Sequence, residues 1–231
     1  MSKKKTDKAV ERVEGVEQAL TKVEQFIETY QKQIVWVVGA ILGIVILFMA
    51  FQNLYVKKKT QEAVAQMFPA EQYFENEDWE RALDGDGNNL GFADIISDYK
   101  FTKAANLAKY YAGICYLRLG EYEEAISYLN KFKSKDKILS SIALGGIGDA
   151  HAQLGDPGKA ISFYKKAASN KSNDFTSPLY LLRAGILLEQ EGKFKEACEL
   201  YERIKADYAA STEGRTIEKY ITRVKIRQNG N

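Results

Sequence analysis

The chain has 231 residues, with 33 basic and 31 acidic side chains and a net charge of +2. This balance argues against a nucleic-acid-binding protein, which usually carries a basic face. Only three prolines occur, and helix-forming Ala, Leu, Glu and Lys are common, so the composition predicts an all-α chain.

The tail formed by residues 1–33 is predicted to be an amphipathic helix. Its apolar residues are spaced alternately three and four apart, which is the a/d pattern of a helical seam. The seam consists of Val13, Val16, Leu20, Val23, Ile27 and Tyr30. Two interpretations stay open, because three heptads are marginal for a stable coiled coil. The helix lies along the membrane surface, or it pairs with a partner or with its own copy.

Residues 34–55 are predicted to form a single transmembrane helix. No charged residue occurs in 34–51, and Leu54 and Tyr55 extend this apolar stretch to the roughly 20 residues that span a bilayer. The stretch starts late in the chain, and no small-residue cleavage site follows it. We therefore expect a retained anchor rather than a cleaved signal peptide.

The orientation of this anchor depends on the basic residues that flank it. The tail carries seven of them, whereas Lys57, Lys58 and Lys59 follow the apolar stretch directly. The whole tail favours an N-terminus in the cytoplasm, but counting only about 15 residues on each side slightly favours the opposite. A tail with seven positive and six acidic groups is hard to translocate. We therefore expect a cytoplasmic tail and a large domain, residues 56–231, on the outer side.

This large domain repeats itself, with four columns of residues recurring at intervals of 35 and then 37. Two columns contain glycine, one contains alanine, and one contains a large side chain, leucine or tyrosine. They hold Gly113, Gly148 and Gly185; Gly120, Gly155 and Gly192; Ala125, Ala160 and Ala197; and Leu129, Tyr164 and Tyr201. The first glycine would let two helices approach closely, the second would end a helix with positive φ, and the alanine would sit where the helices cross. The pattern predicts helix–turn–helix units that must stack on one another.

At these columns the sequence resembles the tetratricopeptide repeat (TPR) family. The segments LGEYEEAISYLNKF (119–132) and LGDPGKAISFYKKA (154–167) match its consensus well, although Lys109 and Pro157 depart from the family's Trp and Tyr. The resemblance implies a TPR α-solenoid. Its full repeats are expected at 106–139, 141–174 and 178–211.

Additional units are expected at both ends of this array. A degenerate repeat at 61–100 is indicated by residues that reproduce the spacing around a TPR turn: Ala70, Tyr73, Trp79 and Ala82. Extra residues are expected in the loop 84–92. A capping helix is expected within 212–228, because repeat arrays need a polar outer face. The basic residues of that helix are interpreted as this solvated face: Lys219, Arg223, Lys225 and Arg227.

The single histidine and the two cysteines do not predict chemistry. His151 falls in a column filled by Tyr116 and Leu188 in the other repeats, so we expect it in or near the core. A zinc site needs several Cys or His at close spacing, and none exists. Cys115 and Cys198 lie in repeats that are not neighbours, so we expect two free, largely buried thiols.

An acidic stretch, Asp84 to Asn88, weakly resembles a calcium loop. Asn89 and Ile95 stand where such a loop needs Gly and Glu, so the pattern fails. Taken with the histidine and the cysteines, this predicts a protein that is not an enzyme and holds no metal or cofactor.

The first helices of the repeats are predicted to present a mostly apolar concave face, the surface through which TPR proteins usually bind. Helical projection gives Val64, Met67, Phe74, Leu107, Tyr110, Ile114, Leu117, Leu179, Leu182 and Ile186. The second repeat contributes a more neutral set, Gly145, Asp149 and Gln153. An exposed apolar groove indicates a protein partner. The alternative is a groove filled by the chain's own inserted loop or final helix.

The layout of a short tail, one span and a repeat domain resembles the ancillary subunits of the SecYEG translocon. That resemblance implies a bacterial inner-membrane protein with a periplasmic TPR domain. Its implied partners are the translocon, a membrane-anchored prolyl-isomerase-type chaperone, translocating polypeptides and membrane lipid, with no nucleic acid or small-molecule substrate. The first alternative is an envelope-assembly or cell-division coordinator that binds a cell-wall synthesis complex. The second, if the orientation is reversed, is a cytoplasm-facing adaptor on an organelle membrane.

Overall fold

The computed structural model describes residues 29–33, 35–170 and 172–229, and this part of the chain contains helices and no strand. The all-α fold predicted from the sequence is therefore confirmed. The chain divides into two compact units, residues 1–56 and 57–231. Of the tail seam, only Tyr30 lies within the described residues, and it is exposed. The others, Val13, Val16, Leu20, Val23 and Ile27, lie outside them.

The first unit contains the apolar stretch. It belongs to a helix assigned from Thr29 to Glu75, within which an 18-residue window has a mean hydropathy of 2.9 and no buried residue. This helix is long and apolar enough to cross a membrane. The stretch ends in one π-helical segment, η1 (Phe51–Val56), in which the rings of Phe51 and Tyr55 stack with their centroids 5.3 Å apart.

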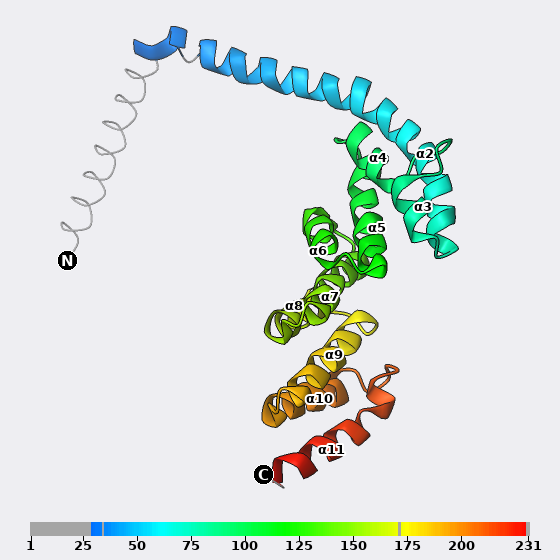
Figure 1. The fold of residues 1–231 in the computed structure, drawn as a ribbon. Helices are drawn as coiled ribbons and strands as arrows, with labels where there is room; N and C mark the ends of the chain where they lie inside the picture. Colours follow the sequence, from blue (N-terminus) through cyan, green and yellow to red (C-terminus); the bar gives the residue numbers. More distant parts are fainter. Residues whose placement is uncertain (1–28, 34, 171, 230–231) are drawn as a thin grey trace, which may run out of the picture. The chain divides into compact units, whose positions relative to one another are not determined.

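The second unit is a stack of antiparallel helix pairs (Figure 1). Consecutive helices pack on one another from α5 to α11. The helices are α2 (Lys57–Glu75), α3 (Trp79–Asp84), α4 (Phe92–Asp98), α5 (Lys103–Leu119), α6 (Tyr122–Lys131), α7 (Lys137–Gln153), α8 (Pro157–Ser169), α9 (Thr176–Gln190), α10 (Phe194–Asp207), the 3₁₀ turn η2 (Gly214–Thr216) and α11 (Glu218–Asn229).

The repeat columns are explained by the close approach of paired helices. A Cβ added to Gly113, Gly148 or Gly185 would lie only 2.6 Å from Leu129, 2.7 Å from Tyr164 and 2.3 Å from Tyr201, respectively. The first and fourth columns of the sequence therefore face each other within each pair. The second glycine column forms the turns, with positive φ at all three positions, and the alanine column is fully buried.

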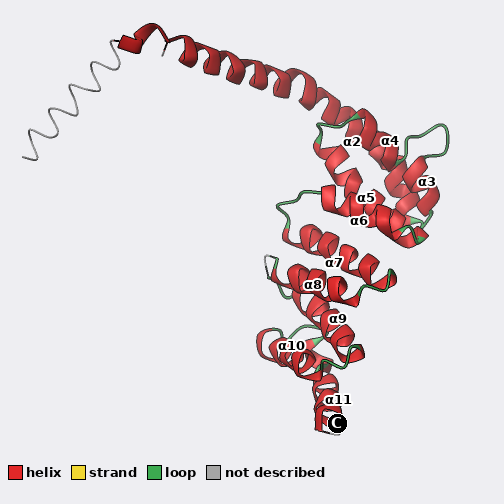
Figure 2. Cartoon of the chain, turned by 60° about the vertical axis from the view of Figure 1, so that its left-hand side comes forward, coloured by secondary structure: helices red, strands yellow, loops and turns green. Residues whose placement is uncertain are grey.

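The unit before these pairs is less regular. The second helix of an ordinary pair is here divided into α3 and α4, which are joined by the loop 85–91 (Figure 2). Asp86 organises this loop, because its carboxylate accepts hydrogen bonds from the Tyr73 hydroxyl at 2.7 Å, from both backbone and side-chain nitrogens of Asn89, and from the backbone of Asn88. These bonds, first that of Tyr73, lower the pKa of Asp86. Among the described residues, no group of three or more His, Cys, Asp or Glu could hold a metal ion.

The histidine and the thiols lie where the sequence predicts them. His151 is half-buried, with its ring stacked on that of Phe163 at 5.4 Å. Cys115 is buried and Cys198 half-buried, and both are free. Burial raises the pKa of the Cys115 thiol to about 12, which makes it a poor nucleophile.

The C-terminal helix is attached by charge as well as by apolar contacts. Ile221 and Val224 are buried, as expected for a cap. The basic residues of this helix, however, are not simply a solvated face. The Arg223 guanidinium donates to both carboxylate oxygens of Glu189, at 3.0 and 2.7 Å, and Lys225 binds Glu202 at 2.7 Å. The amphipathic pattern alone could not reveal this, because the acidic partners lie on other helices.

Candidate partner-binding groove

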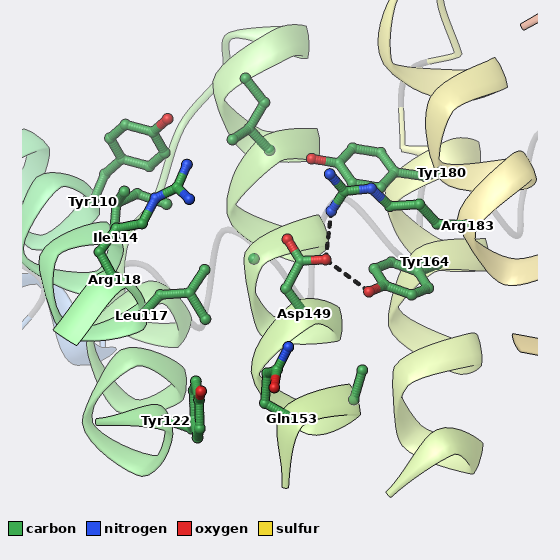
Figure 3. Close-up of a pocket in the computed structure, with 13 residues that line it drawn as sticks. Tyr110, Ile114, Leu117, Arg118, Tyr122, Asp149, Gln153, Tyr164, Tyr180 and Arg183 are labelled. Atoms are coloured by element: carbon green, nitrogen blue, oxygen red, sulfur yellow. Dashed lines mark hydrogen bonds and ion pairs between the residues drawn. The ribbon is translucent and has the colours of Figure 1, made fainter. Parts of the chain in front are cut away.

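A groove of about 520 Å³ lies where α5, α7 and α9 line up in the stack (Figure 3). Most of its walls come from the first helices of the three regular pairs. The lining residues are Tyr110, Ile114, Leu117, Arg118, Tyr122, Ile142, Gly146, Asp149, Ala152, Gln153, Tyr164, Tyr180 and Arg183. No described residue of loop 85–91 or of α11 is among them. The groove is therefore not filled by either of the two segments that the sequence offered as its occupants.

The apolar wall belongs to α5. Ile114 and Leu117 face α7 at Gly146, where an added Cβ would lie 3.7 and 3.8 Å from their methyl groups. Leu129 lies closer still, 3.0 Å from that added Cβ, so the absence of a side chain at Gly146 lets Leu129, Ile114 and Leu117 pack directly on α7. A partner's apolar side chain would lose its water here against aliphatic and tyrosine carbon.

The opposite wall is polar and internally paired. Asp149 of α7 accepts a 2.6 Å hydrogen bond from the hydroxyl of Tyr164 on α8, and it forms an ion pair with Arg183 of α9. Burial, and then this bond to Asp149, raise the pKa of Tyr164, so the hydroxyl stays protonated and donates. The Asp149 charge is thus neutralised within the wall by its own neighbours, as Figure 3 shows.

One cation in the groove has a different environment. Arg118 is exposed at the C-terminal end of α5, and its guanidinium lies 5.8 Å from the ring centroid of Trp79. Gln153 of α7, also exposed, and Tyr122 lie at one end of the groove, whereas Figure 3 shows the Arg118 guanidinium directed toward Tyr110. The groove therefore offers a positive charge and hydrogen-bonding groups beside the apolar wall. The groove is more polar than the sequence predicted.

The structure brings together only some of the residues projected onto the concave face. Tyr110, Ile114 and Leu117 line the groove, as do Asp149 and Gln153 of the more neutral set. The other projected residues do not line it: Val64, Met67, Phe74, Leu107, Leu179, Leu182, Ile186 and Gly145.

The N-terminal members of this second group occupy three different environments. Met67 is buried, and Phe74 packs edge-on against Trp79, Phe92 and Tyr111. Leu107 packs against the core around Leu129. Val64 is exposed on α2. Phe74 thus belongs to the aromatic core of the degenerate unit.

In α9, Tyr180 and Arg183 point to the groove in place of the projected leucines. Gly145 leaves a space on α7 that the Tyr180 ring fills, since an added Cβ would lie 2.0 Å from that ring. Leu179 and Leu182 pack instead against the core that α8, α9, α10 and α11 share. Ile186 is half-buried. The adjacent glycines at 145 and 146 were the signal in the sequence for a large neighbour at this point.

Comparison with protein families places this groove in a known type of repeat. Tetratricopeptide repeat models match residues 107–136, 142–174 and 180–211. These ranges cover the pairs α5–α6, α7–α8 and α9–α10, which carry the glycine and alanine columns. A search of curated proteins found no match.

Proposed function

We propose that this chain, which contains three tetratricopeptide repeats, is a membrane-anchored, non-catalytic scaffold whose groove binds a segment of a partner protein. Such repeats typically serve protein–protein interaction. The observation that supports this most is the groove between α5, α7 and α9, which is open to a ligand and in which the Asp149 carboxylate is already paired.

The lining suggests the chemistry of the partner segment. Ile114 and Leu117 would take an apolar side chain, and Arg118 would take a carboxylate close to it. An ion pair at Arg118 would mainly set specificity and the association rate, while burial of the apolar side chain would supply most of the affinity. The proposed ligand is a short segment that combines an aliphatic or aromatic residue with an acidic one.

The anchor is proposed from the apolar stretch that precedes the repeats. Its mean hydropathy of 2.9 and its exposed surface fit a bilayer span. We propose an N-terminus in the cytoplasm and a repeat domain in the periplasm of a bacterial inner membrane. A reporter that is active only in the periplasm, fused after Asn231, tests this. Activity would support the orientation, whereas an inactive, intact fusion would favour the cytoplasm-facing adaptor.

We further propose that the partner belongs to the protein-export machinery. The candidates are the SecYEG translocon, a membrane-anchored prolyl-isomerase-type chaperone or an emerging polypeptide. The support is the layout of tail, single span and repeat domain, together with a groove suited to apolar segments. If the anchor holds the groove beside the channel exit, the effective concentration of emerging polypeptide segments at the groove is raised. The groove could then bind such segments even with modest intrinsic affinity.

Co-purification of the full chain in mild detergent tests the groove and the partner together. The informative variant is Arg118→Glu, which reverses an exposed charge in the groove. The matched control is Arg215→Glu, an exposed arginine of η2 outside the groove. We expect translocon subunits with the wild type and the control, and a loss of about tenfold or more, equivalent to about 1.4 kcal/mol, with Arg118→Glu.

Other outcomes of this experiment would overturn one part of the proposal or the other. Cell-wall enzymes recovered in place of translocon subunits, and lost with Arg118→Glu, would favour the envelope-assembly coordinator. Partners that are retained equally by both variants would contradict binding at this groove.

A further inference from the structure

One large apolar side chain is exposed at the start of each of α5, α7 and α9, either just before the helix or in its first turn. Phe101, Ile138 and Phe175 are 70%, 43% and 66% exposed, and they are spaced 37 residues apart in both steps. None of them belongs to the core clusters of the repeats. All three therefore present apolar surface outside these cores.

The loops that lead into these helices are held in defined conformations. The Thr102 and Asp136 side chains cap α5 and α7 by accepting backbone hydrogen bonds from Ala105, and from Ile138 and Leu139. Asn173 does the same before α9, where its side-chain oxygen accepts from the backbone of Phe175 and Thr176 at 3.0 and 2.8 Å. The caps fix the backbone beside each apolar side chain, so the display does not depend on loop disorder.

The three loops share one edge of the stack, because every connection from a second helix to the next first helix emerges on the same side. Figure 2 shows the α6–α7 and α8–α9 connections on one side and the α7–α8 turn on the other. The beginning of α2 lies at this edge as well. Tyr99, which ends α4 beside Phe101, donates a 3.0 Å hydrogen bond to Glu62 and lies under the Lys59 ammonium, 5.2 Å from its ring centroid.

The edge is also basic. Exposed lysines flank the first two apolar residues: Lys100, Lys103, Lys131, Lys133, Lys135 and Lys137. Within 131–137 there are four lysines and one aspartate, and that aspartate, Asp136, is already used to cap α7. Asp98 and Asp174 are the exposed acids nearest the other two apolar residues. The largest local excess of positive charge is therefore at the middle loop.

We propose that this edge, defined by Phe101, Ile138, Phe175 and the lysines beside them, rests on the surface of an anionic lipid bilayer. Apolar side chains inserted at the headgroup boundary, flanked by lysines that attract anionic lipid, form an interfacial membrane contact. Lys57, the first residue of α2, follows the apolar stretch directly in the sequence. The inference rests on the anchoring proposed above and adds a second, peripheral contact by the repeat domain.

A bilayer suits this edge better than a protein partner does. Protein-binding surfaces gather their apolar side chains into one contiguous patch, whereas these three are spread over three repeats, and lysines flank two of them. A lipid surface can accept separated apolar groups at the same depth. The contact would fix the direction in which the groove opens relative to the membrane.

Photo-cross-linking of the full chain in lipid nanodiscs tests this proposal. Benzoylphenylalanine replaces Phe175, or replaces Leu154 as the control. Leu154 is an exposed apolar residue at the α7–α8 turn, on the opposite edge. We expect cross-links to lipid from position 175 and not from 154, more strongly with phosphatidylglycerol than with phosphatidylcholine alone. A second variant, Lys133→Glu with Lys135→Glu and Lys137→Glu, should reduce the yield in phosphatidylglycerol nanodiscs several-fold.

The outcomes separate this inference from the proposed function. A chain that inserts into nanodiscs but gives equal or no lipid cross-links from positions 175 and 154 would overturn the edge contact and leave the anchor intact. Cross-links from position 175 to protein, found in native membranes without any to lipid, would overturn it in favour of a protein partner. A chain that fails to insert would instead contradict the anchor itself, and with it the contact that rests on it.

Discussion

Two clusters of the same three chemical groups join successive first helices of the stack, and they differ in exposure. Asp149, Tyr164 and Arg183 join α7 to α9, and Glu189, Tyr201 and Arg223 join α9 to α11. In each cluster the arginine follows the acid by 34 residues. The acid side chain is 30% exposed in the first cluster and 4% exposed in the second.

This difference separates a structural role from the proposed binding role. The Glu189 carboxylate is buried and is held by Arg223 and Tyr201, with Arg227 more distant at 3.5 Å, so losing Arg223 or Tyr201 leaves a buried charge with weaker pairing. Asp149 lies in the wall of the groove, where water or a ligand can replace a missing partner. The first cluster can therefore adjust to a bound segment, whereas the second locks the C-terminal helix onto the stack.

Replacing the two arginines one at a time should give the largest contrast. Arg223→Ala is expected to destabilise the docking of α11 by about 3 kcal/mol, because it removes the bidentate partner of a buried carboxylate. Arg183→Ala is expected to cost about 1 kcal/mol or less, since its partner is partly solvated. Hydrogen exchange of the α11 and α9 amides in the full chain measures both. Equal costs would show that exposure does not distinguish the clusters.

Removing the two tyrosine hydroxyls should give a smaller contrast in the same direction. Tyr201→Phe deletes the 2.6 Å bond to Glu189 and is expected to cost about 2 kcal/mol, as for a hydrogen bond to a buried charge. Tyr164→Phe deletes the bond to Asp149 and is expected to cost about 1 kcal/mol. Denaturant unfolding of each variant against wild type provides the test, and a greater loss for Tyr164→Phe would reverse the assignment of roles.

Acidification should loosen the buried cluster. Burial alone would raise the pKa of Glu189, but hydrogen bonds from Arg223 and Tyr201 outweigh it and leave the pKa below the ordinary value of 4.5. A carboxyl whose pKa is lower in the folded state stabilises that state above its unfolded pKa, and the contribution disappears as the pH falls through the folded value. The α11 amides should therefore lose protection below pH 4.5.

The variant Glu189→Gln is the control for this pH dependence. Its loss of α11 protection should be less steep with pH, because the titrating group has been removed. An identical pH profile in the wild type and in Glu189→Gln would assign the acid sensitivity to other carboxyls, such as Glu202, whose pKa is also lowered by its bond to Lys225.

The sequence was most informative where a single contact decides the residue. Gly185 has to be small because the Tyr201 ring lies against it, and both residues recur in register, so the pairing of helices could be predicted. Helical projection of the first helices also led to Tyr110, Ile114 and Leu117 in the groove wall.

Contacts between repeats could not be predicted in the same way. The Glu189–Arg223 pair joins α9 to α11. Each residue looks like an ordinary surface charge in the sequence of its own helix. Arg183 reaches the groove because Tyr180 fills the space left by Gly145, a fit that depends on the relative rotation of two helices. The insertion between α3 and α4 was expected from the sequence, but no periodic pattern encodes the hydrogen bonds by which Asp86 holds this loop.

Site-directed cross-linking from the groove tests the central claim most directly. Benzoylphenylalanine replaces Leu117 in the full chain expressed in its native membrane, with the same substitution at Leu154 as the reference position. We predict that position 117 captures a partner protein, that position 154 does not, and that Arg118→Glu abolishes the capture. No product from position 117, or a product that Arg118→Glu leaves unchanged, would contradict the assignment of this groove as the binding site.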